Sequence, residues 1–276
     1  MSSKVYLVIS PHGYDATLFC GGTIAHLLEE GHAVHVVRVL DDAKKACTGT
    51  LEQARARSEC ESEMAIRTLG NPGLTHLGYP EDGISLADWH SLREKIVRLI
   101  RQLKPFVVMS FDPWALYDEE YEHLLVARIV EDACRCSAGH LFHSEHMDAG
   151  LLPHSVAQRI YFGRSLSRIN HVVDISSQIE VKVNAMMQHK QALCFLVEGF
   201  LNRLRANRLR LPLMDDTGDA QEIHAHLMEQ FIRRNASEVG RSAGLRCGEG
   251  FRLDRFGELD DFVEAVAEPV RSDEED

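Results

Sequence analysis

Short apolar runs alternate with longer amphipathic segments along the first half of the chain. The apolar runs are bounded by Gly or Pro, as buried strands are, and the segments between them space their apolar residues as helices do. This pattern predicts strands at 4–10, 33–40, 74–79 and 106–111, and helices at 17–31, 51–69 and 86–103. Apolar strands that alternate with helices are typical of a doubly wound, Rossmann-like α/β fold, with a mostly parallel sheet covered on both faces.

The alternation is less regular in the second half. We expect two more short strands and then mostly helical segments, at 159–164, 171–176, 178–193 and 196–240, with a break at 211–220. We therefore divide the chain into an α/β domain over 1–195 and a mostly helical extension over 196–276. The extension packs on or beside the domain and ends in an acidic, disordered tail. It could be a lid, the interface of a homo-oligomer or a cover for the sheet.

Charge and composition narrow the range of partners. The formal net charge of −12 disfavours nucleic acid and anionic membranes, and no apolar run is long enough to span a bilayer. The seven cysteines contain no CxxC pair, which favours free thiols over a disulfide framework. With no signal peptide pattern at the N-terminus, these features predict a cytoplasmic protein that acts on a small-molecule substrate.

Three polar residues stand at or near the predicted carboxyl ends of strands. His12 and Asp15 follow the first strand, and His123 lies in the segment after the fourth. Ligands bind at this edge of a parallel sheet, and two histidines with one carboxylate suit zinc with an open position for water. In a chain with 15 histidines, each of them taken singly could equally be a hydrogen-bonded histidine.

Residues 5–136 resemble the LmbE/PIG-L family of zinc-dependent de-N-acetylases. The family shows a motif of the form PHPDDE…GCGGTIA, then R…E…A…LG, LGYPD.G and HPDH. This chain has matching stretches in the same order, namely "SPHGYDATLFCGGTIA", "RARSECESEMAIRTLG", "LGYPEDGI" and "EYEHLL". The resemblance implies the α/β fold and a zinc-activated water that removes an acyl group from nitrogen.

The resemblance also implies roles for particular residues. His12, Asp15 and His123 match the metal ligands, which would hold one Zn²⁺ per chain or another divalent ion. Asp82 matches a position that the family uses toward substrate, and we add Tyr121 and Arg57 as candidate substrate-binding residues. Asp112 could orient a ligand or cap a turn, His189 is expected to pack or hydrogen-bond, and Glu249 could shape the pocket.

Other positions depart from the family pattern. Tyr14 stands where the family has its general base, an Asp, and a phenol is a poor base at neutral pH. Glu120 and Glu122 replace the first His and the Asp of HPDH. We therefore take Tyr14, Glu120 and Glu122 as candidate catalytic residues, with either glutamate moving protons and Tyr14, Tyr117 or Tyr121 donating to the oxyanion.

Three functions are compatible with these substitutions. One is a hydrolase that removes an N-acyl group from an amino sugar or a related conjugate. Another is a hydratase of an unsaturated or enolic acid, similar to 4-oxalomesaconate hydratase, in which a phenol acts as acid. The last is a pseudoenzyme that retains the metal. Because all three ligands are present, an enzyme is favoured, and we take the hydrolase as the prediction.

Overall fold

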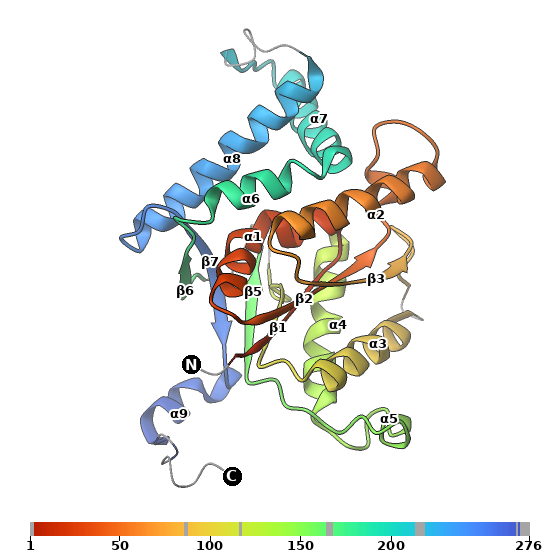
Figure 1. Cartoon of the computed structure of the whole chain (residues 1–276), viewed down its shortest axis with the longest axis vertical. Helices are drawn as coiled ribbons and strands as arrows, with labels where there is room; N and C mark the ends of the chain where they lie inside the picture. Colours follow the sequence, from red (N-terminus) through yellow and green to blue (C-terminus); the bar gives the residue numbers. More distant parts are fainter. Residues whose placement is uncertain are drawn as a thin grey trace.

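The computed structural model describes residues 3–85, 88–115, 118–163, 168–212, 219–268 and 270, and one seven-stranded sheet runs through them (Figure 1). The strand order is β3-β2-β1-β4-β5-β7-β6. The first five are parallel, and β7 runs antiparallel to both of its neighbours. The strands are β1 Val5–Ser10, β2 Ala33–Leu40, β3 Gly73–Tyr79, β4 Val107–Phe111, β5 Gln158–Phe162, β6 His171–Asp174 and β7 Gly248–Asp254. This confirms the predicted doubly wound α/β fold.

Helices cover both faces of the sheet. One core layer joins α3 and α4 to β1 and β2, and the other joins α1, α2 and α6 to the opposite face. A third layer packs α7 and α8 against α6 and the start of α1, outside the sheet (Figure 1). The α-helices are α1 Gly13–Glu29, α2 Leu51–Thr68, α3 Asp88–Leu103, α4 Tyr121–Ser137, α5 Glu145–Asp148, α6 Ile179–Met186, α7 Lys190–Ala206, α8 Ala220–Ser242 and α9 Asp260–Val266, with 3-10 turns η1 Ala43–Lys45 and η3 Gly257–Leu259.

The sheet topology determines where a ligand can bind. The chain order runs outward from β1 to β2 and β3, and then returns to place β4 on the other side of β1. At such a switch point the following loops diverge above and below the sheet and leave a crevice at the carboxyl ends of the strands. His12 follows β1 at this crevice, and the segment after β4 leads to His123 at the start of α4.

The C-terminal part contributes a strand to the sheet. β7 lies between β5 and β6, and the boundary expected at residue 195 falls inside α7. The sequence "GEGFRLD" of β7 has two glycines and three charged residues, so it lacks the apolar run by which the other strands are recognised. The helix expected over 178–193 is two helices, α6 and α7, separated near His189.

Glu249 of β7 is a structural residue beneath α1. Its carboxylate accepts hydrogen bonds from the backbone N–H groups of Gly22 and Thr23, at 3.0 and 2.7 Å, and pairs with Lys182 Nζ at 2.5 Å. These amides are free because Cys20 departs from helical geometry and breaks the hydrogen-bond ladder of α1. A Cβ on Gly22 would come within 2.8 Å of Ile175, so the glycine permits this close packing.

The preference for free thiols is wrong for two of the seven cysteines. Cys47, which precedes α2, and Cys194 in α7 form a disulfide across 147 residues of sequence. Residues so distant in sequence form no recognisable spacing motif, and only the fold brings them together. Because stable disulfides are uncommon in a reducing cytoplasm, the cysteines no longer support the expected cytoplasmic location.

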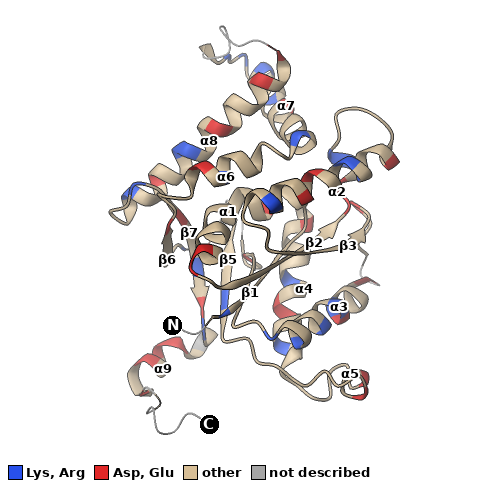
Figure 2. Ribbon diagram, viewed as in Figure 1, with Lys and Arg blue, Asp and Glu red and all other residues tan. Residues whose placement is uncertain are grey.

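Charged residues of both signs are distributed over the outer helices, including α2, α3, α7 and α8 (Figure 2). In the described ranges, no helix combines the length and apolar character needed to cross a membrane.

Candidate metal centre

His12 and Asp15 form one unit at the start of α1. His12 is the N-cap residue, and its backbone N–H donates to Asp15 Oδ2 at 2.8 Å. The same oxygen lies 3.2 Å from His12 Nδ1. With a carboxylate at Nδ1, the neutral ring carries its proton there and its lone pair on Nε2. The turn therefore presents His12 Nε2 and the second Asp15 oxygen, Oδ1.

His123 is oriented in the same way at the start of α4. Its Nδ1 lies 3.0 Å from both carboxylate oxygens of Asp118, which leaves Nε2 as the acceptor. The sequence analysis considered Asp112 for this role and missed Asp118. The structure pairs Asp112 with the Arg252 guanidinium and with the Trp114 backbone N–H.

Each of the three predicted ligands leaves one buried acceptor atom unused. His12 Nε2, Asp15 Oδ1 and His123 Nε2 have no hydrogen-bond partner among the described residues. Asp15 Oδ1 lies 3.7 Å from His123 Nε2, and the two rings are 5.4 Å apart at 67°. Zinc bonds of about 2.0–2.2 Å allow two ligands of one ion to lie up to about 4 Å apart. Buried orphan acceptors at this spacing fit a divalent metal ion, since burial without a partner is costly.

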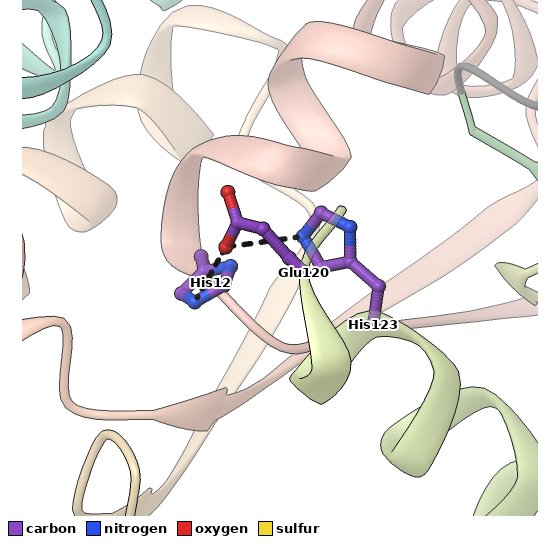
Figure 3. A group of neighbouring side chains, drawn as sticks. All are labelled: His12, Glu120 and His123. Atoms are coloured by element: carbon purple, nitrogen blue, oxygen red, sulfur yellow. Dashed lines mark ion pairs between the residues drawn. The ribbon is translucent and has the colours of Figure 1, made fainter. Parts of the chain in front are cut away.

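Three glutamates surround the same point. Glu120 Oε2 is 3.8 Å from both His12 Nε2 and His123 Nε2 (Figure 3). Glu122 Oε2 and Glu81 Oε1 lie 3.5 and 3.6 Å from His12 Nε2. Sequence reasoning missed Glu81, although it precedes Asp82 in the matched "YPEDG" stretch. Two sets of these residues bring three ligand atoms close enough for one ion, namely His12 with Glu120 and His123, and His12 with Glu81 and Glu122.

The three glutamates differ in their contacts with Lys45 of η1. Its Nζ is 2.7 Å from Glu120 Oε2 and 3.3 Å from Glu81 Oε1. Glu122 Oε1 instead accepts the backbone N–H of Asp82 at 2.7 Å. Glu120 keeps a side chain that is 32% exposed, whereas Glu81 and Glu122 are much more enclosed. Glu120 is therefore the carboxylate that a bound substrate can reach.

The negative charge is reflected in the pKa values of the ligands. Burial lowers the pKa of His12, but the surrounding carboxylates outweigh it and raise that pKa well above its usual value. Burial raises the pKa of Asp15, but the two histidine rings outweigh it and lower that pKa below its usual value. A cluster with this excess of negative charge favours a cation, which here is a proton or a metal ion.

Tyr14 is enclosed beside the metal ligands. Its ring stacks on His12 with an interplanar angle of 8°, and its buried hydroxyl has no hydrogen-bond partner. Burial and the carboxylates of Asp15 and Glu120 raise the pKa of Tyr14 well above its usual value. The phenol thus stays protonated and can donate a hydrogen bond, and it cannot serve as a base at neutral pH.

Of the predicted substrate-binding residues, Asp82 lies at the rim of the metal centre, and the other two lie farther from the metal ligands. Asp82 is exposed and pairs with Lys44 at 2.8 Å, next to Glu122. Tyr121 is 70% exposed, and Arg57 donates to the Thr48 carbonyl by a short hydrogen bond beside a different cavity. The structure does not bring Tyr121 or Arg57 to the metal ligands. The Tyr117 candidate lies outside the described residues.

Another group of potential ligands contains His143, Glu145 and His146. The rings of the two histidines stack 5.4 Å apart at 21°, and His146 Nε2 lies 2.8 Å from Glu94 Oε1. Because a lone pair lies in the plane of its ring, nearly parallel stacked rings do not aim at one point. Burial and the Arg93 guanidinium also lower the pKa of His143, so positive charge is disfavoured there.

Comparisons with known proteins indicate which family and which enzymes this chain resembles. Residues 7–134 match the model of the PIG-L family, described as GlcNAc-PI de-N-acetylase. Diacetylchitobiose deacetylase of Thermococcus kodakarensis is 29% identical over 254 residues, which cover 91% of this chain and 83% of that protein.

Two solved structures share the fold. N,N'-diacetylchitobiose deacetylase from Pyrococcus horikoshii has a TM-score of 0.76 at 24% identity, covering 96% of this chain and 90% of that one. GalB, the 4-carboxy-2-hydroxymuconate hydratase from Pseudomonas putida KT2440, has a TM-score of 0.67 at 17% identity, covering 97% and 100%. At these identities the likeness extends to the fold alone.

Proposed function

We propose that this chain hydrolyses the N-acyl group of an amino sugar or a related conjugate with a bound divalent metal ion. The proposal is supported by the match of residues 7–134 to the PIG-L family model and by the similarity of the chain to a diacetylchitobiose deacetylase. The proposal rests on three buried acceptor atoms, His12 Nε2, Asp15 Oδ1 and His123 Nε2, that have no hydrogen-bond partner in the described part of the chain, with Asp15 Oδ1 3.7 Å from His123 Nε2.

These three residues would hold the metal, and zinc suits them best. When bound, such an ion activates water at neutral pH and polarises a carbonyl. Asp15 is a better ligand than Glu120 because its free oxygen is fully buried and unpaired, whereas the Glu120 oxygen is neutralised by Lys45. Asp118 fixes the His123 ring so that Nε2 faces the site.

We assign proton transfer to Glu120. It is the accessible carboxylate, and its Oε2 is equally close to the two ligating nitrogens. The family's base position is occupied by Tyr14, so the acid–base group must come from another element, and Glu120 at the N-terminus of α4 supplies it. Glu120 would take the proton of the attacking water and return it to the leaving amine. Lys45 orients this carboxylate.

Tyr14 would donate its hydrogen bond to the oxygen on which negative charge develops. A preorganised, protonated donor in a buried site is the arrangement that stabilises such an oxyanion. The Tyr14 hydroxyl has no hydrogen-bond partner in the free enzyme. In the reaction it would donate to the developing oxyanion, which would account for the missing partner.

Mutation of these two residues tests the assignment. Glu120→Gln should lower kcat for deacetylation of N-acetylglucosamine-containing substrates by about 100-fold or more, and Tyr14→Phe by a similar factor. The control is Glu63→Gln on α2, whose side chain is 48% exposed and pairs with Arg67, and which should leave kcat unchanged. Full activity in Glu120→Gln would refute Glu120 as the base.

A hydratase remains the second candidate, since a protonated Tyr14 could also supply a proton to a carbon–carbon double bond. The same purified, zinc-loaded enzyme distinguishes the two. Release of free amine from N-acetylated sugars supports the hydrolase. Hydration of an unsaturated dicarboxylic acid with no amine release would support the hydratase.

A further inference from the structure

An apolar cavity adjoins the metal centre on the side of α7 and α8. Its volume is about 720 Å³, which is in the range of sites for small molecules. Glu120 lines it together with Glu119, so the cavity opens beside the accessible carboxylate of the metal centre. Its apolar walls come from both helices and include Phe195, Val197, Phe200, Leu227, Met228 and Phe231.

The walls expose large aromatic side chains. Phe195 and Phe200 are each 39% exposed and Phe231 is 48% exposed, so apolar area remains for a ligand to cover. Lys45 links the cavity to the metal centre, because its Nζ lies 5.0 Å from the Phe195 ring centre while it pairs with Glu120.

The metal centre also has a polar rim. Lys44 and Asp82 form an exposed ion pair there. Their backbone amides donate to Glu81 and Glu122, the two carboxylates that lie close to His12. A reacting amide at the metal centre would thus have both a polar rim and an apolar cavity beside it.

We propose that this cavity binds the acyl chain of the substrate, so that the enzyme prefers N-acyl groups of medium length to acetyl. The inference rests on the proposed hydrolase function and specifies its substrate class. An amide carbonyl has two substituents, a polar amino sugar and an acyl chain. The sugar hydroxyls would lose their hydrogen bonds against phenylalanine and leucine, whereas the chain gains by burial. The sugar then faces the polar rim.

The reaction is ordinary amide hydrolysis. One water is consumed, a C–O bond forms as the C–N bond breaks, the proton goes to the amine, and the products are a fatty acid and the amino sugar. No oxidant or further reactant is needed.

A substrate series tests the proposal in the zinc-loaded wild-type enzyme. Values of kcat/KM are measured for N-acetyl-, N-butyryl- and N-octanoylglucosamine and for the octyl glycoside of N-acetylglucosamine. We expect about a two- to fourfold gain per methylene, and N-octanoyl at least tenfold above N-acetyl. Phe231→Ser should remove most of this gain for N-octanoyl over N-acetyl. The control is Phe262→Ser on α9, which is 63% exposed and does not line the cavity.

The outcomes separate the acyl-chain proposal from the proposed function. Hydrolysis of the acetyl substrate with no gain for N-octanoyl overturns the acyl-chain proposal and leaves the deacetylase. A gain for the octyl glycoside alone overturns it too, because the apolar tail would then belong to the amine side. No hydrolysis of any amide by the zinc-loaded enzyme overturns both.

Discussion

His12 and His189 are two buried histidines with opposite surroundings. Each is the N-cap residue of its helix, α1 for His12 and α7 for His189, and they are 0% and 3% exposed. His12 Nε2 has no hydrogen-bond partner and faces three glutamates. His189 Nε2 lies 3.0 Å from Thr17 Oγ1, a partner within the protein.

The two environments also shift the pKa in opposite directions. Burial and the nearby Arg38 lower the pKa of His189 to about 3, so this ring is neutral and structural. At His12, carboxylates outweigh an equally complete burial and raise the pKa well above its usual value. Burial alone therefore does not identify a ligand. An unpaired acceptor in a field of negative charge supports the proposal that His12 is a ligand.

The largest expected difference between these histidines is in metal content. His12→Ala and His123→Ala should each lose the metal, because two remaining ligands hold zinc weakly. His189→Gln should keep about one zinc per chain, since Gln can preserve the contact with Thr17. Elemental analysis after dialysis against metal-free buffer measures this. Equal zinc in wild type and His12→Ala would place the metal elsewhere.

The fold was predictable from sequence because β1 to β4 are short apolar runs and the helices between them space their apolar residues as amphipathic helices do. β7 was not, because its glycines and charges interrupt the apolar pattern. The disulfide was not predictable because 147 residues separate Cys47 from Cys194.

Of the candidate metal centre, the residues that follow strands directly could be predicted. His12 and Asp15 are three residues apart on one turn, so their proximity follows from local geometry. Asp118 and Glu81 were missed because their roles depend on how the loops fold back over the sheet. Tyr121 and Arg57 were placed by their position near motifs, but the helices turn them toward solvent or a different cavity.

A smaller effect is expected from the residue that orients His123. Asp118→Asn removes the carboxylate that fixes Nδ1 and should weaken zinc binding by about 10- to 100-fold without abolishing it. Competition with a chromophoric chelator measures the affinity. Glu119→Gln, an exposed neighbour, should bind zinc as the wild type does. An unchanged affinity in Asp118→Asn would show that His123 is positioned by α4 alone.

The smallest effect concerns stability in acid and depends on His189. Its pKa is about 3 in the folded protein and about 6.5 in an unfolded chain, so above pH 6.5 both states hold it neutral. As the pH falls below 6.5, His189 becomes protonated in the unfolded state but stays neutral in the folded state. The free energy of unfolding therefore falls, by about 2 kcal/mol at pH 5 from this group, and levels off only below pH 3.

His189→Gln removes this loss, because Gln does not titrate. Urea unfolding of the zinc-free proteins at pH 7 and pH 5 should show a drop that is smaller by about 2 kcal/mol in the variant than in the wild type. His140→Gln changes an exposed histidine and should retain the wild-type drop. If His189→Gln loses as much stability in acid as the wild type does, the buried ring is not the group that resists protonation, and the contrast with His12 would lie in their hydrogen-bond partners alone.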